Sequence, residues 1–246
     1  MRHNPIAGAL YLLRGLSLIT RPGVRTFVAI PLAINVVLFT LAIWLGWTEV
    51  EAAADRWLPD WEWLRYLIYP IFFLAAALVL FFTFAIIGNV IAAPFNGLLA
   101  EAVERQLTGA GPDPDGGWKR LAAESAQAMG SEIRKLGYIM VRGVPLLILF
   151  VIPGVNAFAP FIWMAFSAWM LAISFVDYPM GNHGFTFPEQ RRRLGERRFL
   201  GLGFGAAVMV ATTIPLVNFF VIPCAVAGAT ALWVERLAEL GPPGRA

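Results

Sequence analysis

Two apolar stretches of this chain are each interrupted by proline and asparagine. The first interruption reads Ile152-Pro153-Gly154-Val155-Asn156-Ala157-Phe158, and the second reads Ile214-Pro215-Leu216-Val217-Asn218-Phe219-Phe220. They lie in the charge-free segments 143–176 and 199–234 and form a weak internal repeat. Most of the halves hold about 10–16 residues, whereas a helix needs about 20 to span a bilayer. The pattern therefore predicts two re-entrant helical hairpins, and two full crossings per stretch are the alternative.

The composition indicates a membrane protein. Hydrophobic residues make up 59% of the 246 residues and charged residues 14%, against about 25% charged in a soluble domain. A single cysteine, Cys224, excludes a disulfide framework. With only two histidines beside it, we expect no metal and no cofactor. The net charge of +3 is too small to indicate a nucleic-acid partner.

Two charge-poor stretches nearer the N-terminus predict complete crossings, 26–48 and 66–108. The second is too long for one span, so we expect its span to end near Val90, a break or turn at Pro94 and an amphipathic extension after it. The predicted fold is an all-α integral membrane protein. It has two long transmembrane helices, two re-entrant (hemi-penetrating) helical hairpins and amphipathic cytoplasmic helices.

The distribution of charge predicts the topology. Segment 1–25 carries four arginines and no acid, while 49–65 carries five acids and two arginines. The positive-inside rule places the first in the cytoplasm and the second outside. We predict a single membrane domain over 1–246. Its first half consists of a cytoplasmic amphipathic helix (1–25), a transmembrane helix (26–48), a periplasmic loop (49–65) and a transmembrane helix with a cytoplasmic extension (66–108). A cytoplasmic loop and helix (109–142) then lead to a re-entrant hairpin (143–176). A basic cytoplasmic loop (177–198), a second re-entrant hairpin (199–234) and a tail (235–246) complete the chain.

A candidate anion site lies where the first transmembrane helix begins. Pro22 and Gly23 end a helix predicted over 6–19, and the next helix starts near Val24. The amides of a helix N-terminus attract anions, and Arg25 adds a planar fork of donors for an oxyanion. Arg21 adds charge nearby. The alternative is that these arginines only set the orientation of the chain.

A second polar cluster lies at the inner end of the second span and after the third stretch. Its members are candidates for a pore or gate, and the alternative is hydrogen bonding between helices. The candidates are Asn89, Asn96, Glu101, Arg105 and His183, the last of which follows the 143–176 stretch, and the cluster also contains Glu104. The glycine-rich segment 201–205 follows no predicted strand and is assigned to close helix packing. No phosphate-binding loop, nucleophile elbow or zinc motif is present, so we expect no enzyme.

The run Ala92-Ala93-Pro94-Phe95-Asn96-Gly97-Leu98-Leu99-Ala100-Glu101 resembles the signature of the CysZ family of bacterial sulfate permeases. Segments 22–27 and 177–183 and both interrupted turns fit as well. The resemblance implies a multi-pass protein of the bacterial inner membrane that imports sulfate for cysteine synthesis and works as a homo-oligomer. It assigns sulfate binding to Gly23, Val24, Arg25 and Thr26. Members of the family often have a second basic residue where this chain has Thr26.

Three other functions stay open at this point. One is a less selective anion channel that also takes sulfite or related oxyanions. Another is a non-transporting membrane scaffold that assists another transporter. A membrane enzyme acting on lipids is disfavoured, because the sequence has no constellation of metal ligands or nucleophile and base.

Overall fold

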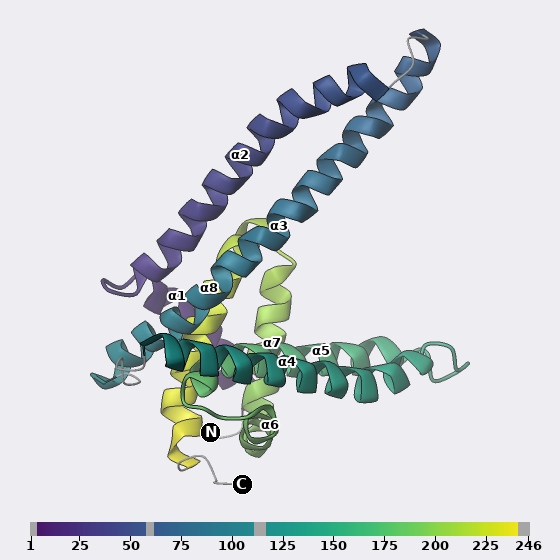
Figure 1. The fold of residues 1–246 in the computed structure, drawn as a ribbon. Coiled ribbons are helices and arrows are strands. Elements are labelled where there is room, and N and C mark those ends of the chain that lie inside the picture. The colour runs from purple at the N-terminus through teal and green to yellow at the C-terminus, as the bar shows by residue number, and fades with distance from the viewer. Residues whose placement is uncertain (1–3, 58–61, 111–116, 241–246) are drawn as a thin grey trace. The chain divides into compact units, whose positions relative to one another are not determined.

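The computed structural model describes residues 4–57, 62–110 and 117–240, and within these ranges it describes only the backbone at 45–55, 57, 62–65, 67–68, 84–94, 117–129, 131–132 and 240. The described part is helical and contains no strand. Its elements are α1 (Pro5–Ile19), α2 (Arg25–Trp57), α3 (Glu62–Thr108), α4 (Gly117–Ile148), α5 (Ala159–Asn182), α6 (Phe187–Glu196), α7 (Arg198–Thr212) and α8 (Pro215–Leu232), followed by a π-helical turn (Trp233–Leu237) and a 3₁₀ turn (Ala238–Leu240) (Figure 1).

The chain divides into two units, each with its own packing. Unit 2 is Thr26–Phe95 and consists of most of α2 and the first part of α3. Its two long helices contact each other through Phe39 and Phe81, whose ring centres are 6.0 Å apart. Unit 1 contains Met1–Arg25 and Asn96–Ala246. It holds α1, the end of α3 and all later helices.

Three described helices are long and apolar enough to cross a membrane. They are Arg25–Trp44, Ala159–Asn182 and Pro215–Leu237, with 20, 24 and 23 residues. A helix of about 20 residues matches the roughly 30 Å of a hydrocarbon core. The prediction of a helical membrane protein is confirmed at this level.

Two predictions about unit 2 and its continuation were wrong. Segment 49–65 is not simply a loop, because α2 extends to Trp57 and α3 begins at Glu62. The chain also has no break at Pro94, which lies inside the continuous helix α3. A proline removes one amide donor but does not have to end a helix, since neighbouring groups can satisfy the freed carbonyl.

Close contacts between backbones hold the centre of unit 1 together. Gly203 of α7 lies against the carbonyl oxygen of Pro5, and Gly205 lies against that of Ala168. Gly15 of α1 meets the backbone of α8 at Cys224 in the same way. A side chain at any of these glycines would overlap backbone atoms of the partner helix. The assignment of segment 201–205 to close helix packing is confirmed.

The two interrupted stretches differ from each other in local structure, although the repeat predicts a similar interruption in both. In the first, α4 ends at Ile148 and residues 149–158 form turns before α5 begins at Ala159. Helix α5 continues to Asn182, so this half is longer than expected and has the length of a full span. In the second, only residues 213–214 separate α7 from α8, and Pro223 lies inside α8.

Three further boundaries differ from the predictions. Helix α4 runs through position 142, where a cytoplasmic segment was expected to end and a hairpin to begin. The predicted basic loop 177–198 is mostly helical, because it contains the end of α5, all of α6 and the first residue of α7. The predicted tail starts inside the π-helical turn Trp233–Leu237. Helix α6 starts at a capping box in which Thr186 and Glu189 bond to each other, a local signal that favours a helix over a loop.

Candidate functional site

A tight turn joins α1 to the start of α2 and contains the predicted sulfate-binding residues. Gly23 adopts a left-handed backbone with φ of +88°, which glycine reaches without steric cost. The Arg21 carbonyl accepts hydrogen bonds from the amides of Val24 at 3.2 Å and Arg25 at 3.1 Å. Val24 is fully buried, whereas Arg21 and Arg25 are exposed. The buried valine anchors the turn and leaves both guanidinium groups at the surface.

The same turn decides which amides remain available to an anion. The amides of Val24 and Arg25 already donate within the turn. Within the described residues, the amides of Thr26 and Phe27 have no partner outside α2, as expected for the first residues of a helix. The available backbone donors are therefore the amides of Thr26 and Phe27, which lie further along the chain than the predicted donors at Val24 and Arg25.

The second predicted cluster is partly assembled where α3 meets α5 in unit 1. The Asn96 side-chain amide donates to the Tyr178 hydroxyl at 3.3 Å. The Asn182 side-chain amide donates to the Gly97 carbonyl at 3.0 Å. These bonds join segments about 80 residues apart in the sequence. Asn96 thus forms a hydrogen bond between helices, which was the alternative to a role in a pore or gate.

His183 contacts Glu104, a member of the predicted polar cluster at the inner end of the second span. Its Nε2 lies 2.8 Å from Oε1 and 3.0 Å from Oε2 of Glu104. Glu104 is only 7% exposed, while a third of the His183 side chain, 33%, is accessible. The His183 ring also lies 5.6 Å from that of Trp233. A buried carboxylate next to a half-exposed histidine is an arrangement that can hold or pass a proton.

The other members of the cluster have different surroundings. Glu101 is half-buried, and Arg105 is exposed near the end of α3. The side chain of Asn89 lies outside the described residues. Gly97 and Glu104 are seven residues apart and therefore lie on one face of α3.

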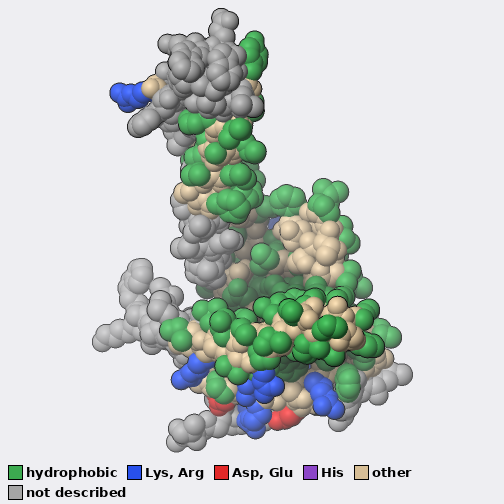
Figure 2. Space-filling model, turned by 90° about the vertical axis from the view of Figure 1, so that its right-hand side faces the viewer, with side chains coloured by type: hydrophobic (Ala, Val, Ile, Leu, Met, Phe, Trp, Pro, Cys, Tyr) green, Lys and Arg blue, Asp and Glu red, His purple; other side chains and the backbone are tan. Residues whose placement is uncertain are grey.

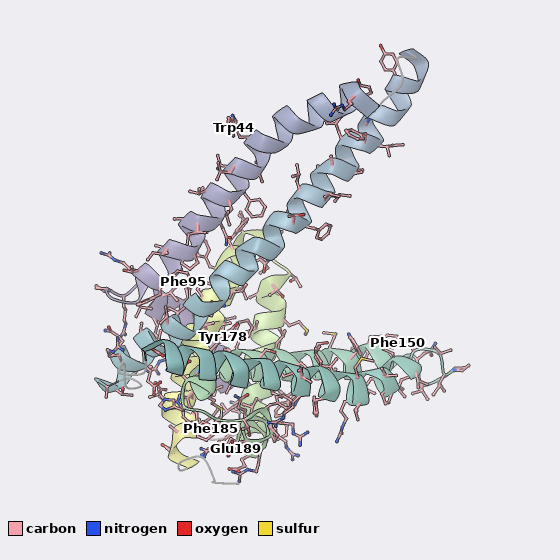
Figure 3. All side chains as sticks on the ribbon, in the orientation of Figure 1. Trp44, Phe95, Phe150, Tyr178, Phe185 and Glu189 are labelled. Atoms are coloured by element: carbon pink, nitrogen blue, oxygen red, sulfur yellow. The ribbon has the colours of Figure 1, made fainter. Side chains whose placement is uncertain are left out.

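A second polar network adjoins this contact at α6. Lys135 pairs with Asp177 at 2.5 Å, and the Gln190 amide donates to Asp177 at 2.6 Å and to the Phe185 carbonyl at 3.0 Å. Figure 3 shows Phe185 close to Glu189 of α6, and Phe150 away from both at the end of the α4–α5 pair. The Thr186 amide donates to Glu189, and this bond lowers the pKa of Glu189 from its usual value.

Helix α1 and the π-helical turn Trp233–Leu237 meet through a third network. Tyr11 and Arg14 of α1 both bond to Glu235, the first at 3.1 Å and the second at 2.9 Å. Arg236 donates to the Tyr11 hydroxyl at 3.1 Å. Burial raises the pKa of Tyr11, against the effect of the Arg236 donor, which lowers it. These bonds fix α1, and with it the start of the turn at Gly23, to the π-helical turn Trp233–Leu237 that follows α8.

The described residues contain no group of three or more histidine, cysteine or carboxylate side chains that could hold a metal ion. The polar side chains instead form ion pairs and hydrogen bonds between helices. Together with the apolar helices of spanning length, they define the class of this protein as a helical membrane protein.

Sequence comparison identifies the family within that class. The chain matches the family described as "Sulfate transporter CysZ/Etoposide-induced protein 2.4" over residues 11–223, and it belongs to that family. It is 41% identical over 238 residues to proteins named "Sulfate transporter CysZ" from two strains of Pseudomonas aeruginosa, LESB58 and PAO1. It is 42% identical to the protein of that name from Pseudomonas paraeruginosa (strain DSM 24068 / PA7). Each alignment covers 95% of this chain and 97% of the relative.

The resemblance noted in the sequence is confirmed by these matches. The relatives are named as transporters, which agrees with the expectation that the chain is not an enzyme.

Proposed function

We propose that this chain is a sulfate permease of a bacterial inner membrane, which imports sulfate for assimilation into cysteine. The observation that carries the proposal is its identity of 41–42% to three sulfate transporters over nearly the whole of each chain. Family membership over residues 11–223 and the helices of spanning length support it.

The proposed membrane arrangement keeps a single membrane domain of several passes. Residues 26–48 and 66–108 contribute the complete crossings, and the α4–α5 and α7–α8 pairs are re-entrant hairpins. Helix α7 has 15 residues, fewer than the roughly 20 that a span needs, which supports a hairpin. The four arginines of segment 1–25 favour a cytoplasmic N-terminus. Apolar side chains exposed on the described helices suit contact with lipid and with further copies in a homo-oligomer.

Sulfate is proposed to bind at the start of α2, at Gly23, Val24, Arg25 and Thr26. The left-handed Gly23 leaves space for close approach of an oxyanion, because no atom lies within 4 Å of the position that a Cβ would occupy. Arg25 supplies charge-assisted donors, and the unpaired amides of α2 add the positive end of the helix dipole. Arg21 raises the positive potential near the site.

The proposed route for the ion includes Asn89, Asn96, Glu101, Arg105 and His183. Support comes from the α3–α5 contact, where Asn96 and His183 bond to Tyr178 and Glu104. No ATP-binding motif is present in the sequence, so the flux follows the sulfate gradient or is coupled to an ion. In this scheme the Glu104–His183 pair adjusts the route and does not bind sulfate.

Uptake of labelled sulfate by liposomes containing the purified protein tests the function. Arg25→Ala should weaken sulfate binding by tenfold or more, because a hydrogen bond to a charged group contributes about 1.5–3 kcal/mol. The matched control is Arg192→Ala, which removes the same charge from a surface pair with Glu196 and should leave uptake unchanged. Unchanged sulfate affinity in a folded Arg25→Ala protein would refute the proposed site.

Competing anions separate the permease from the other candidates. A selective permease is inhibited by sulfite or related oxyanions far more than by chloride. Equal inhibition by chloride would identify a general anion channel. No uptake of sulfate by the folded wild-type protein would favour a scaffold that assists another transporter.

A further inference from the structure

The first residue of α7 holds a positive charge against an exposed aromatic ring. The Arg198 Cζ atom lies 5.2 Å from the centre of the Phe199 ring. Both residues are exposed, and Phe199 keeps 45% of its surface accessible. A guanidinium and the face of an aromatic ring attract each other at this distance. The charge is therefore in direct contact with apolar surface.

Arg198 forms no ion pair in the part of the chain that the structure describes. Two neighbouring arginines of α6 differ in this respect, because their side chains are engaged within the protein. Arg192 pairs with Glu196 at 3.9 Å, and the buried Arg193 has its Cζ atom 4.3 Å from the centre of the Phe185 ring. An anion from outside the chain can therefore reach the Arg198 guanidinium without displacing a carboxylate.

An apolar row continues from Phe199 along one face of α7. Leu202, Ala206 and Val210 follow Phe199 within an arc of roughly 80°, because successive residues of an α-helix are about 100° apart. Val210 is 59% exposed, and the two residues between it and Phe199 are half-buried. Phe204 lies on the opposite face and is fully buried. These four residues, the α7 row, thus form the side of α7 that the rest of the protein leaves accessible.

The length of the α7 row matches one leaflet of a bilayer. The distance along the helix from Phe199 to Val210 is about 16 Å at a rise of 1.5 Å per residue, and one leaflet contributes about half of a 30 Å hydrocarbon core. Helix α7 runs from α6 to the turn before α8 (Figure 1). On the face drawn in Figure 2, Lys and Arg side chains gather below a band of hydrophobic side chains. A cation at one end of a row of this length fits a phospholipid, with the phosphate at the cation and an acyl chain along the row.

We propose that Arg198 binds the phosphate of an anionic phospholipid, one acyl chain of which lies along the α7 row. The guanidinium fork matches phosphate oxygens. Because Arg198 contacts Phe199 and the row begins at Phe199, one lipid molecule reaches both the cation and the row. The positive charge of the adjacent Arg197 favours a head group with a net negative charge. Inorganic phosphate would leave the row uncovered. This site is separate from segment 21–26 and does not depend on the proposed transport of sulfate.

Native mass spectrometry of the full chain in detergent measures the binding. Phosphatidylglycerol and phosphatidylcholine with the same acyl chains are titrated separately, and the first should bind more tightly. Arg198→Gln should weaken phosphatidylglycerol binding about fivefold, which corresponds to about 1 kcal/mol for one arginine near a membrane. The control Arg192→Gln removes the same charge from an arginine paired with Glu196 and should change binding less than twofold.

A second pair of variants tests the apolar half of the site. Val210→Asn places a polar amide where the acyl chain is proposed to lie, and it should weaken phosphatidylglycerol binding about threefold or more, because an apolar contact without a partner for the amide disfavours it. The control Ile133→Asn makes a similar change at an apolar residue of α4 that is 65% exposed, and it should change binding less than twofold.

Four results would overturn the proposal. They are equal loss in Arg192→Gln and Arg198→Gln, equal binding of both lipids to the wild type, wild-type affinity in Val210→Asn, and displacement of phosphatidylglycerol by an equal concentration of inorganic phosphate. Circular dichroism verifies that each variant is folded. If Arg198→Gln does not fold, the salt dependence of the wild type replaces it. Raising the salt concentration about tenfold should weaken binding of phosphatidylglycerol more than that of phosphatidylcholine, because salt screens an exposed cation. An equal effect on both lipids would contradict binding by Arg198.

Discussion

The close contact of Gly205 with α5 predicts that replacing this glycine by alanine lowers the stability of the protein. A Cβ atom at Gly205 would overlap the carbonyl oxygen of Ala168, and it would lie 2.7 Å from the carbonyl carbon of Ala168 and 3.1 Å from the amide nitrogen of Ala172. These are backbone atoms, which cannot rotate away as a side chain can. Helices α5 and α7 must therefore separate to accept Gly205→Ala.

Two opposing effects set the size of the change. Alanine favours an α-helix over glycine by about 0.8–1.0 kcal/mol, whereas overpacking a close contact costs about 1–3 kcal/mol. Because the overlap at Gly205 is severe, the upper end of the overpacking cost applies. The free energy of unfolding should therefore fall by about 2 kcal/mol after the gain in helix propensity is subtracted. A change of this size lowers the unfolding temperature of a chain of this length by roughly 4–8 °C.

This prediction is checked by thermal unfolding of the purified protein in detergent, monitored by circular dichroism. The matched control is Gly137→Ala in α4, where a Cβ atom would meet nothing within 4 Å. The control keeps only the gain in helix propensity and should raise the unfolding temperature by a few degrees. If Gly205→Ala is as stable as Gly137→Ala, the inferred close packing of α5 on α7 is incorrect.

Three further predictions concern the polar networks. Lys135→Met leaves the largely buried Asp177 carboxylate without its cation and should lower the free energy of unfolding by up to about 3 kcal/mol, as measured by thermal unfolding. The Thr186 amide lowers the folded-state pKa of Glu189 below its usual value near 4.5, so the stabilisation is present above that value and disappears as the pH falls through the folded-state pKa. The unfolding temperatures of wild type and Glu189→Gln should therefore differ most at neutral pH and converge in acid; a constant difference would contradict this. The contact between His183 and Glu104 should appear in a double-mutant cycle as a coupling of about 0.5–3 kcal/mol, and additive losses would show that the two residues act independently.

Local signals in the sequence predict the helices near the N-terminus well. The break at Pro22 and Gly23 is strong because glycine alone adopts the left-handed backbone there easily, and α1 ends at Ile19 as expected. The glycine-rich segment 201–205 also predicts its own role, since small residues permit close contact whichever helix lies opposite. In both cases the information lies within a few residues of the feature.

The candidate site is less predictable because its contacts join distant segments. Asn96 and His183 are recognisable as polar residues beside apolar stretches. Their partners Tyr178 and Glu104 lie 82 and 79 residues away, and only the packing of α3 on α5 brings them together. The amides of Val24 and Arg25 likewise bond to Arg21, which depends on the geometry of the turn more than on its composition.

The two interrupted turns have similar sequences but different structures, and a single residue explains the difference. In both, the backbone amide of the asparagine donates to the carbonyl of the isoleucine four residues earlier, at 3.0 Å for Asn156 and 2.9 Å for Asn218. The turns then diverge after the proline. Gly154 takes a left-handed φ of +83°, which keeps the chain out of a helix until Ala159. Leu216 occupies the equivalent position and cannot adopt that conformation cheaply, so α8 continues from the proline at its first position. The shared motif therefore specifies one hydrogen bond, and the residue between proline and valine decides whether a turn or a helix follows.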